Sequence, residues 1–220
     1  CRLVMLTLVR LLLMLAAIIA ARVFVPVADS PAQTSLFMLM ESSTAIVAML
    51  LFAPDQRSLL AWSPWCAATI ALLLLTFACD PQVPLAMGRV APLLLVNLAM
   101  AFTFAALALY LAPNSVVSLF IFFSLAPVWA SPILEVLNNP DWLNKLVVGI
   151  SPLTAMAVAL DADYLRSPWF YEHSAIASMR YVYPDMITVL AALALAPVTM
   201  VLIQSNKNNS KRELIGDVSS

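Results

Sequence analysis

The chain has 220 residues, of which 63% are hydrophobic and only 10% are charged, and its formal net charge is −1. Soluble domains carry about 25% charged residues, so a water-soluble fold of this composition would lack the polar surface to cover itself. The near-neutral charge, with no basic cluster ahead of the C-terminal tail, gives no basis for binding nucleic acid. Alternating strand patterns are absent, and we therefore expect an all-α polytopic membrane protein whose main partner is the lipid bilayer.

The cysteine and histidine content argues against several kinds of site. The three cysteines show no paired spacing, and Cys66 and Cys79 fall inside apolar runs, where cysteine acts as a small hydrophobic residue. A single histidine, His173, excludes a bis-histidine haem site within this chain. The chain begins at Cys1 rather than at methionine, and we interpret it as a fragment or a processed product.

Apolar runs separated by polar or proline-rich connections predict six transmembrane helices. The predicted spans are about 3–27, 36–52, 65–79, 91–112, 116–137 and 186–204. The polar tail, 205–220, follows the last span. Pro127 and Pro132 lie inside the fifth run, where Ser124 and Ser131 are close enough to satisfy the carbonyl groups that the prolines leave free.

The distribution of lysine and arginine in short connections predicts a cytoplasmic C-terminus. With a cytoplasmic N-terminus and six spans, the basic residues outside the spans are Arg2, Arg57, Lys207, Lys211 and Arg212 on the inner side and Arg89, Lys145, Arg166 and Arg180 on the outer side. A seventh span at 145–160 would move the basic tail outside, against this rule. We expect a multi-pass protein of the cell membrane, of the bacterial inner-membrane type.

Three polar side chains interrupt the predicted spans: Glu41, Asn97 and Glu135. A lone carboxylate in lipid costs at least about 2.5 kcal/mol, so each acid should face the bundle interior or sit at the interface. Under the predicted topology both acids lie near the outer surface. Two interpretations remain open, simple placement at the interface and lining of an outer vestibule.

The apolar run Leu146–Leu160 is too short for a comfortable crossing. Its 15 residues make about 22 Å of helix, against a hydrocarbon core of about 30 Å. Pro152, together with Gly149 and the extended backbone favoured at Ser151, predicts a bend in the middle of the run. We therefore expect a re-entrant or interfacial helical segment over 142–183, before the last span, and a tilted seventh span is the alternative.

Aromatic residues concentrate in the stretch 161–185, which precedes the last span. It holds five of the ten tryptophan and tyrosine residues, namely Tyr164, Trp169, Tyr171, Tyr181 and Tyr183. Such rings favour the headgroup level, where the ring is buried and the polar tip is hydrated. We expect this stretch to lie along the outer membrane face.

Two acidic motifs in the same stretch can be interpreted either as functional groups or as ordinary polar residues of a surface segment. Asp161 and Asp163 match a D-x-D pair that holds a divalent cation, but the match is only three residues long and no soluble catalytic domain surrounds it, so we expect a solvated turn. Glu172 and His173 would make a general acid–base pair, yet sequence neighbours face different sides of a helix and no nucleophile is evident. We expect no catalytic, cofactor-binding or metal site, and hence no enzyme.

One segment carries a family resemblance. The motif consists of a tryptophan, an I-S-P-L-T sequence and a small-residue helix, at Trp142, Ile150, Ser151, Pro152, Leu153, Thr154, Ala159 and Leu160. It resembles the segment after the fifth span in type-2 ABC transporter permeases. The resemblance implies short outer helices that dip into the membrane, a separate ATP-binding subunit, and a homodimer or heterodimer. The connection 53–64 is shorter than the coupling segment usual in that family.

The sequence therefore supports two functional hypotheses. The first is the permease subunit of an ABC-type exporter, which moves a substrate with the help of a separate ATPase, since no G-x-x-x-x-G-K-[ST] phosphate-binding motif occurs in the chain. The second is a non-catalytic integral membrane scaffold or anchor subunit of a larger complex.

Overall fold

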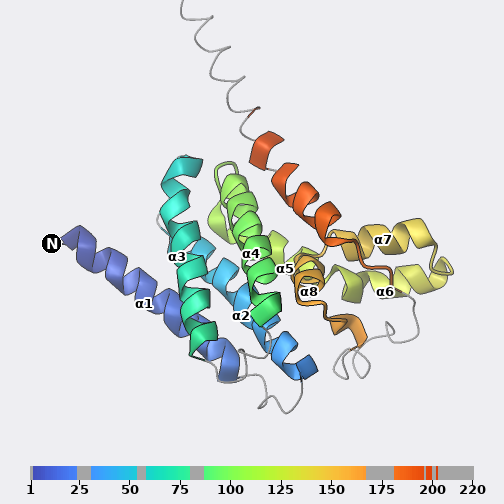
Figure 1. Cartoon of the computed structure of the whole chain (residues 1–220). Coiled ribbons are helices and arrows are strands. Elements are labelled where there is room, and N and C mark those ends of the chain that lie inside the picture. The colour runs from blue at the N-terminus through green and yellow to red at the C-terminus, as the bar shows by residue number, and fades with distance from the viewer. Residues whose placement is uncertain are drawn as a thin grey trace, which may run out of the picture.

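The computed structural model describes residues 2–23, 31–53, 58–79, 87–166, 181–195, 197–199 and 202 (Figure 1). Its helices are α1 (Arg2–Val23), α2 (Pro31–Phe52), α3 (Leu59–Ala78), α4 (Met87–Ala108), α5 (Pro113–Ser124), α6 (Ala126–Val136), α7 (Asp141–Gly149), α8 (Pro152–Leu160), the 3-10 turn η2 (Tyr164–Arg166) and a C-terminal helix, Met186–Thr199. The described part contains no strand, which confirms the all-α expectation. The predicted tail 205–220 lies outside the described residues.

Four helices are long and apolar enough to cross a membrane. The candidate spans are Val4–Ala21, Thr34–Phe52, Leu59–Ala78 and Gly88–Ala108. Two bent helix pairs, α5 with α6 and α7 with α8, would raise the number to six if each pair made one span. The described helices are thus compatible with a multi-pass membrane protein, whereas the count of six spans stays a prediction.

The observed helix bounds differ from the predicted spans in two instructive places. α3 begins at Leu59 rather than near 65, because Ser58 caps it by accepting a hydrogen bond from the N–H of Ala61 at 3.2 Å. The predicted fifth span, 116–137, is not one continuous helix. It is broken at Leu125, and α5 and α6 meet there at 46°.

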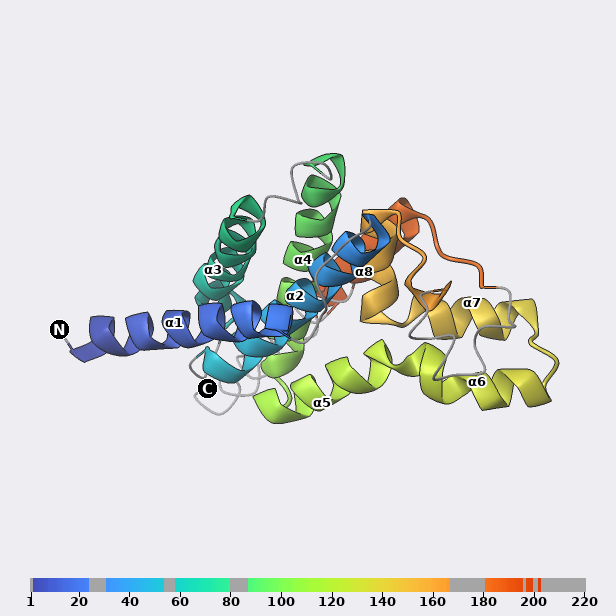
Figure 2. The same cartoon turned by 90° about the horizontal axis from the view of Figure 1, so that it is seen from below.

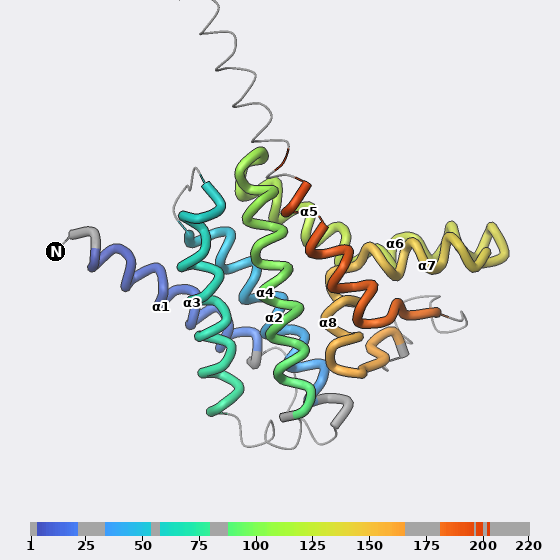
Figure 3. Tube along the Cα trace, turned by 45° about the horizontal axis from the view of Figure 1, so that its top comes forward, coloured from blue at the N-terminus to red at the C-terminus, as the bar shows by residue number. Residues whose placement is uncertain are grey.

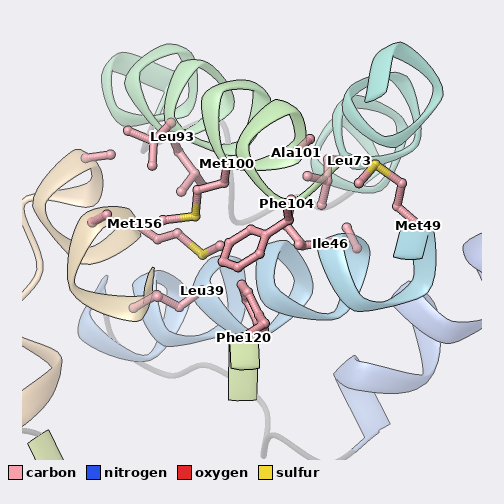
Figure 4. Close-up of a cluster of buried hydrophobic side chains, with 14 of the residues drawn as sticks. Leu39, Ile46, Met49, Leu73, Leu93, Met100, Ala101, Phe104, Phe120 and Met156 are labelled. Carbon is pink, nitrogen blue, oxygen red and sulfur yellow. The ribbon is translucent and has the colours of Figure 1, made fainter. Parts of the chain in front are cut away.

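α2 lies at the centre of the bundle and packs against α1, α3, α4, α5 and α8. Figure 3 shows α3 and α4 side by side, with α2 crossing between them and α1. The core joins these helices through large apolar side chains, drawn in Figure 4: Leu39, Ile46, Met49, Leu73, Leu93, Met100, Phe104, Phe120 and Met156. Phe104 and Phe120 meet edge to face at 5.1 Å and tie α5 to α4.

Two elements project from this bundle in opposite directions (Figure 2). One is the N-terminal half of α1, whose apolar side chains are mostly exposed. The other is the hairpin of α6 and α7, which has a small core of its own made by Ala126, Ala130, Leu134 and Val147. Asn138 and Asn139 form its tip with φ angles of 57° and 50°, a left-handed conformation that asparagine tolerates better than most residues.

Serine–proline pairs explain how prolines are accommodated inside the apolar helices. Proline has no N–H to donate to the carbonyl four residues back. At Pro132 that carbonyl belongs to Val128, and the Ser131 hydroxyl donates to it at 2.8 Å. The expectation that Ser131 compensates a proline in this run is confirmed.

A hydroxyl group also compensates a proline within α3. In the C-terminal helix, Met186–Thr199, the compensating hydroxyl comes from another helix. Ser63 Oγ donates to the Leu60 carbonyl at 2.8 Å, which Pro64 leaves without a backbone donor. For Pro197 the orphaned carbonyl is that of Leu193, which accepts from the Thr103 hydroxyl of α4 at 2.9 Å; this hydroxyl is shared with the Ala99 carbonyl of its own helix at 2.8 Å. A proline thus anchors the C-terminal helix to the central bundle.

Replacing Ser131 with alanine should lower the free energy of unfolding by about 1 kcal/mol, because the Val128 carbonyl loses its donor. In a Pro132→Ala background the backbone N–H returns, and the same change should cost little. Unfolding in detergent, measured for the four proteins of this double-mutant cycle, checks the coupling. Equal effects of Ser131→Ala in both backgrounds would contradict the compensation.

Candidate functional site

The two helix breaks of the structure meet at one point. α5 ends at Ser124, and the chain bends at Leu125 into α6. α7 ends at Gly149, and the chain bends by 87° before α8 begins at Pro152. The Ser151 hydroxyl, at the second break, donates a hydrogen bond to the Ser124 carbonyl, at the first, over 3.1 Å. We call this contact the break junction.

The break junction lies at the turn that the sequence singled out, although the three predicted residues contribute unequally. Pro152 occupies the first position of α8, where its missing N–H costs nothing, and Ser151 has the expected extended backbone. Gly149 is not required, since its φ is negative and an added Cβ would meet nothing within 4 Å. The bend is therefore confirmed, and re-entry of this pair into the membrane stays a prediction.

Besides the Ser124 carbonyl, two further backbone carbonyl groups at the breaks accept hydrogen bonds within the protein. The Trp129 indole N–H donates to the Phe122 carbonyl at 2.9 Å. A side chain of α6 thus supplies a hydrogen-bond donor to a carbonyl group near the end of α5. The Ser151 N–H donates to the Val148 carbonyl at 3.3 Å, the group that Pro152 leaves free. These bonds allow irregular backbone inside an apolar bundle.

A buried hydroxyl cluster adjoins the break junction. The Tyr164 hydroxyl lies 3.0 Å from Thr154 Oγ1 and 3.5 Å from Ser151 Oγ. Burial raises the pKa of Tyr164, and hydrogen bonds from Ser151 and Thr154 oppose this only in part. The phenol therefore keeps its proton and can both donate and accept. Ser124 Oγ, also buried, has no hydrogen-bond partner among the described residues.

A second tyrosine connects this cluster with the start of the C-terminal helix. Tyr183 packs edge to face on Tyr164 at 6.4 Å and donates a hydrogen bond to Asp163 Oδ1 at 2.7 Å. Burial is the main cause that raises the pKa of Tyr183, and the Asp163 carboxylate adds to it. Two residues on, Asp185 caps the helix by accepting from the Thr188 N–H at 2.8 Å, which lowers the pKa of its carboxyl group.

The two acids of the D-x-D match have separate partners. Asp163 bonds Tyr183, whereas Asp161 lies 3.7 Å from Arg89 at the start of α4. Asp161 is almost fully exposed and has a left-handed backbone, φ 51°, at the end of α8. This is the geometry of a solvated turn. The Glu172–His173 pair lies outside the described residues.

The three predicted vestibule residues do not come together. Glu41 is buried near the middle of α2, because the helix begins at Pro31, before the predicted start of the span. Asn97 is buried in α4. Glu135 is exposed on α6, and the break at Leu125 directs that helix away from the bundle. The interior placement is therefore found for the first two residues and not for Glu135.

Sequence reasoning did not foresee that the Tyr164 hydroxyl would lie close to both Ser151 and Thr154. Ser151 directly precedes α8 and Thr154 lies in its first turn, so their three-residue spacing was an available signal that the two hydroxyl groups lie close to one side of the helix start. The position of Tyr164 depends on how the chain turns back after α8, which no local pattern encodes. Comparisons with known proteins found no matching family model, no matching curated protein and no matching solved structure.

Replacing Ser151 with alanine should destabilise the protein by about 1–3 kcal/mol, because the buried Ser124 carbonyl would lose its donor from α8. The matched control is Ser124→Ala, which removes a hydroxyl without a partner and keeps the carbonyl that Ser151 bonds. We expect this control to be neutral or slightly stabilising. Unfolding in detergent measures both, and equal losses would argue against the break junction.

Proposed function

We propose that the chain is the membrane-spanning permease subunit of an ABC-type exporter, which moves a substrate with the energy supplied by a separate ATPase subunit. The observation that carries the proposal is the break junction. Interrupted helices inside a membrane are tolerated where the irregular backbone is buried in protein or lines a cavity, and transporters place their sites at such interruptions.

The fold around the break junction fits this proposal in two further ways. The short helices α7 and α8, bent by 87°, correspond to the pair of short outer helices that the permease resemblance implies. The contact of Arg89 with Asp161 joins two residues that the lysine and arginine distribution assigns to the outer side. Both support six spans in the cell membrane with a cytoplasmic C-terminus.

The projecting elements favour the second candidate, a non-catalytic scaffold or anchor subunit. The N-terminal half of α1 and the α6–α7 hairpin expose apolar side chains well away from the bundle, including Val4, Met5, Val136 and Trp142. In a permease, a second copy or a homologue would cover such surfaces in a dimer. In a scaffold, they would hold other subunits of a complex.

Co-purification separates the two candidates. The tagged chain, extracted from its native membrane in mild detergent, should retain an ATP-binding subunit and vanadate-sensitive ATPase activity. An unrelated polytopic protein with the same tag, taken through the same purification, sets the background. A stable complex that contains other membrane subunits and no ATPase would favour the scaffold.

The proposed orientation can be tested with two cysteines on opposite sides of the predicted α4 span, one in the first turn of α4 and one in the first turn of α5. Gly88 has open space for a side chain, and Asn114 is exposed in the first turn of α5. With the native cysteines replaced, an impermeant maleimide on intact cells should label Gly88→Cys and spare Asn114→Cys until the membrane is opened. The reverse pattern would place the C-terminus outside and refute the orientation.

A further inference from the structure

An exposed apolar face runs along one side of the α6–α7 hairpin, which projects sideways from the bundle (Figure 2). The two helices pack on each other through Ala126, Ala130, Leu134, Leu143 and Val147. Large apolar side chains beside this contact stay exposed. We call them the hairpin face, and they are Trp129, Ile133, Val136, Trp142, Leu146 and Ile150.

Both helices contribute to the same side of the hairpin. In α6, Trp129 and Ile133 each directly precede a residue of the contact with α7, and in α7, Trp142 and Leu146 directly precede a residue of the contact with α6. Figure 2 shows that the two helices run antiparallel. An axis normal to the plane of such a pair relates one helix to the other by a half turn and leaves the two sides of the plane unchanged. Equal offsets from the contact residues therefore place these side chains on one side.

The exposed charged side chains of the hairpin lie outside this face. Glu135 directly follows the contact residue Leu134, and a turn of about 100° carries it to the opposite side of α6. Asp141 and Lys145 stand two residues before and after Leu143, about 200° around α7, so both point away from α6. The hairpin is therefore amphipathic, as are helices that lie in the plane of a membrane interface.

α8 relates the depth of the hairpin to α4. Met156 and Met100 point toward one another in the core (Figure 4), and Asp161, directly after α8, contacts Arg89 in the first turn of α4. α8 thus runs antiparallel to α4. Its first residue, Pro152, lies about 6 Å, one helical turn, beyond the level of Met100 toward the end of α4.

This level is close to one edge of the membrane. The candidate span Gly88–Ala108 is about 31 Å long, which matches a hydrocarbon core of about 30 Å. The end of the span is about 12 Å beyond Met100, and hence about 6 Å beyond the helix break at Pro152. Figure 3 shows α6 and α7 running crosswise to α3 and α4, so the hairpin stays near this depth along its length.

We propose that the α6–α7 hairpin lies flat in the interface of one membrane leaflet, with the hairpin face against lipid acyl chains and the charged side chains at the headgroups. Interfacial helices bury their apolar face to about 5–10 Å, the depth at which the hairpin leaves the bundle. Tryptophan favours the same zone, and Trp129 and Trp142 both belong to the hairpin face. Lipid fits the face better than a protein partner, because its six side chains offer a partner only apolar surface and indole rings.

The inference changes the path predicted for 116–137, since residues 126–136 would not cross the membrane. α8 then carries the chain to the other side, where Asp161 contacts Arg89, so the number of crossings is unchanged. Under the proposed orientation the hairpin lies on the cytoplasmic side, whereas the permease resemblance puts α7 outside. The lipid contact needs neither an ATPase nor a transported substrate and therefore goes beyond the proposed function.

The experiment measures the depth of single nitroxide labels on the full chain in liposomes, by power-saturation electron paramagnetic resonance with oxygen and a water-soluble nickel chelate. The labels are attached at Trp142→Cys and Gly149→Cys, both exposed on α7, in a background without the native cysteines. Gly149 has open space for a side chain. A flat helix gives both labels the same depth, about 5–10 Å, with more contact with oxygen than with nickel. An upright helix would separate them by about 10 Å and overturn the proposal.

The matched control is an exposed pair in the candidate span α3, Leu60→Cys and Ala67→Cys, which has the same seven-residue spacing and should differ in depth by about 10 Å. Glu135→Cys, on the charged side, should meet more nickel than Trp142→Cys. Leu146→Cys gives a second position on the hairpin face in case Trp142→Cys does not fold. A hairpin face shielded from both reagents would indicate a protein contact, such as a second copy, and nickel contact equal to that of Glu135→Cys would place the face in water. Either result would refute the lipid contact.

Discussion

The need to satisfy every backbone carbonyl inside an apolar bundle is the constraint on which this structure depends. Water cannot serve these groups in a membrane, and each proline removes one donor. Hydroxyl groups supply the missing donors. Those of Ser63 and Ser131 bond carbonyl groups of their own helices, and that of Thr103 bonds a carbonyl group of another helix. Small polar residues thus act as structural partners of prolines, which explains why a chain this hydrophobic retains them.

At the Ser151–Pro152 pair the same chemistry gives a different result. The Ser151 hydroxyl does not return to its own helix but reaches the Ser124 carbonyl across the bundle. The helix is therefore free to bend, and two interruptions are held against each other. The α6–α7 hairpin leaves and re-enters the bundle through these two breaks, and it has a small core of its own. Any movement of the hairpin relative to the bundle would have to pass through the break junction.

The polar groups of the bundle fall into two classes. Hydroxyl groups such as that of Thr69 bond a carbonyl of their own helix and need nothing else. Ser42 and Asn97 leave oxygen atoms without a partner in the described structure, although burial makes such atoms costly. This contrast within one core separates hydroxyl groups that bond their own helix from buried polar atoms that the described residues leave without a partner.

The sequence by itself determined the helical class, the apolar helices and the bend at Pro152, because these follow from composition, run length and the missing N–H of proline. It also placed Ser131 beside the carbonyl that it serves, since that contact lies within one helical turn. Only the tertiary structure decided that Ser151 would bond Ser124, that Tyr164 would join them, and that Glu135 would separate from Glu41 and Asn97. Contacts between distant segments depend on how the helices pack, and the break at Leu125, which no single residue of the run dictates, turns α6 away from the bundle.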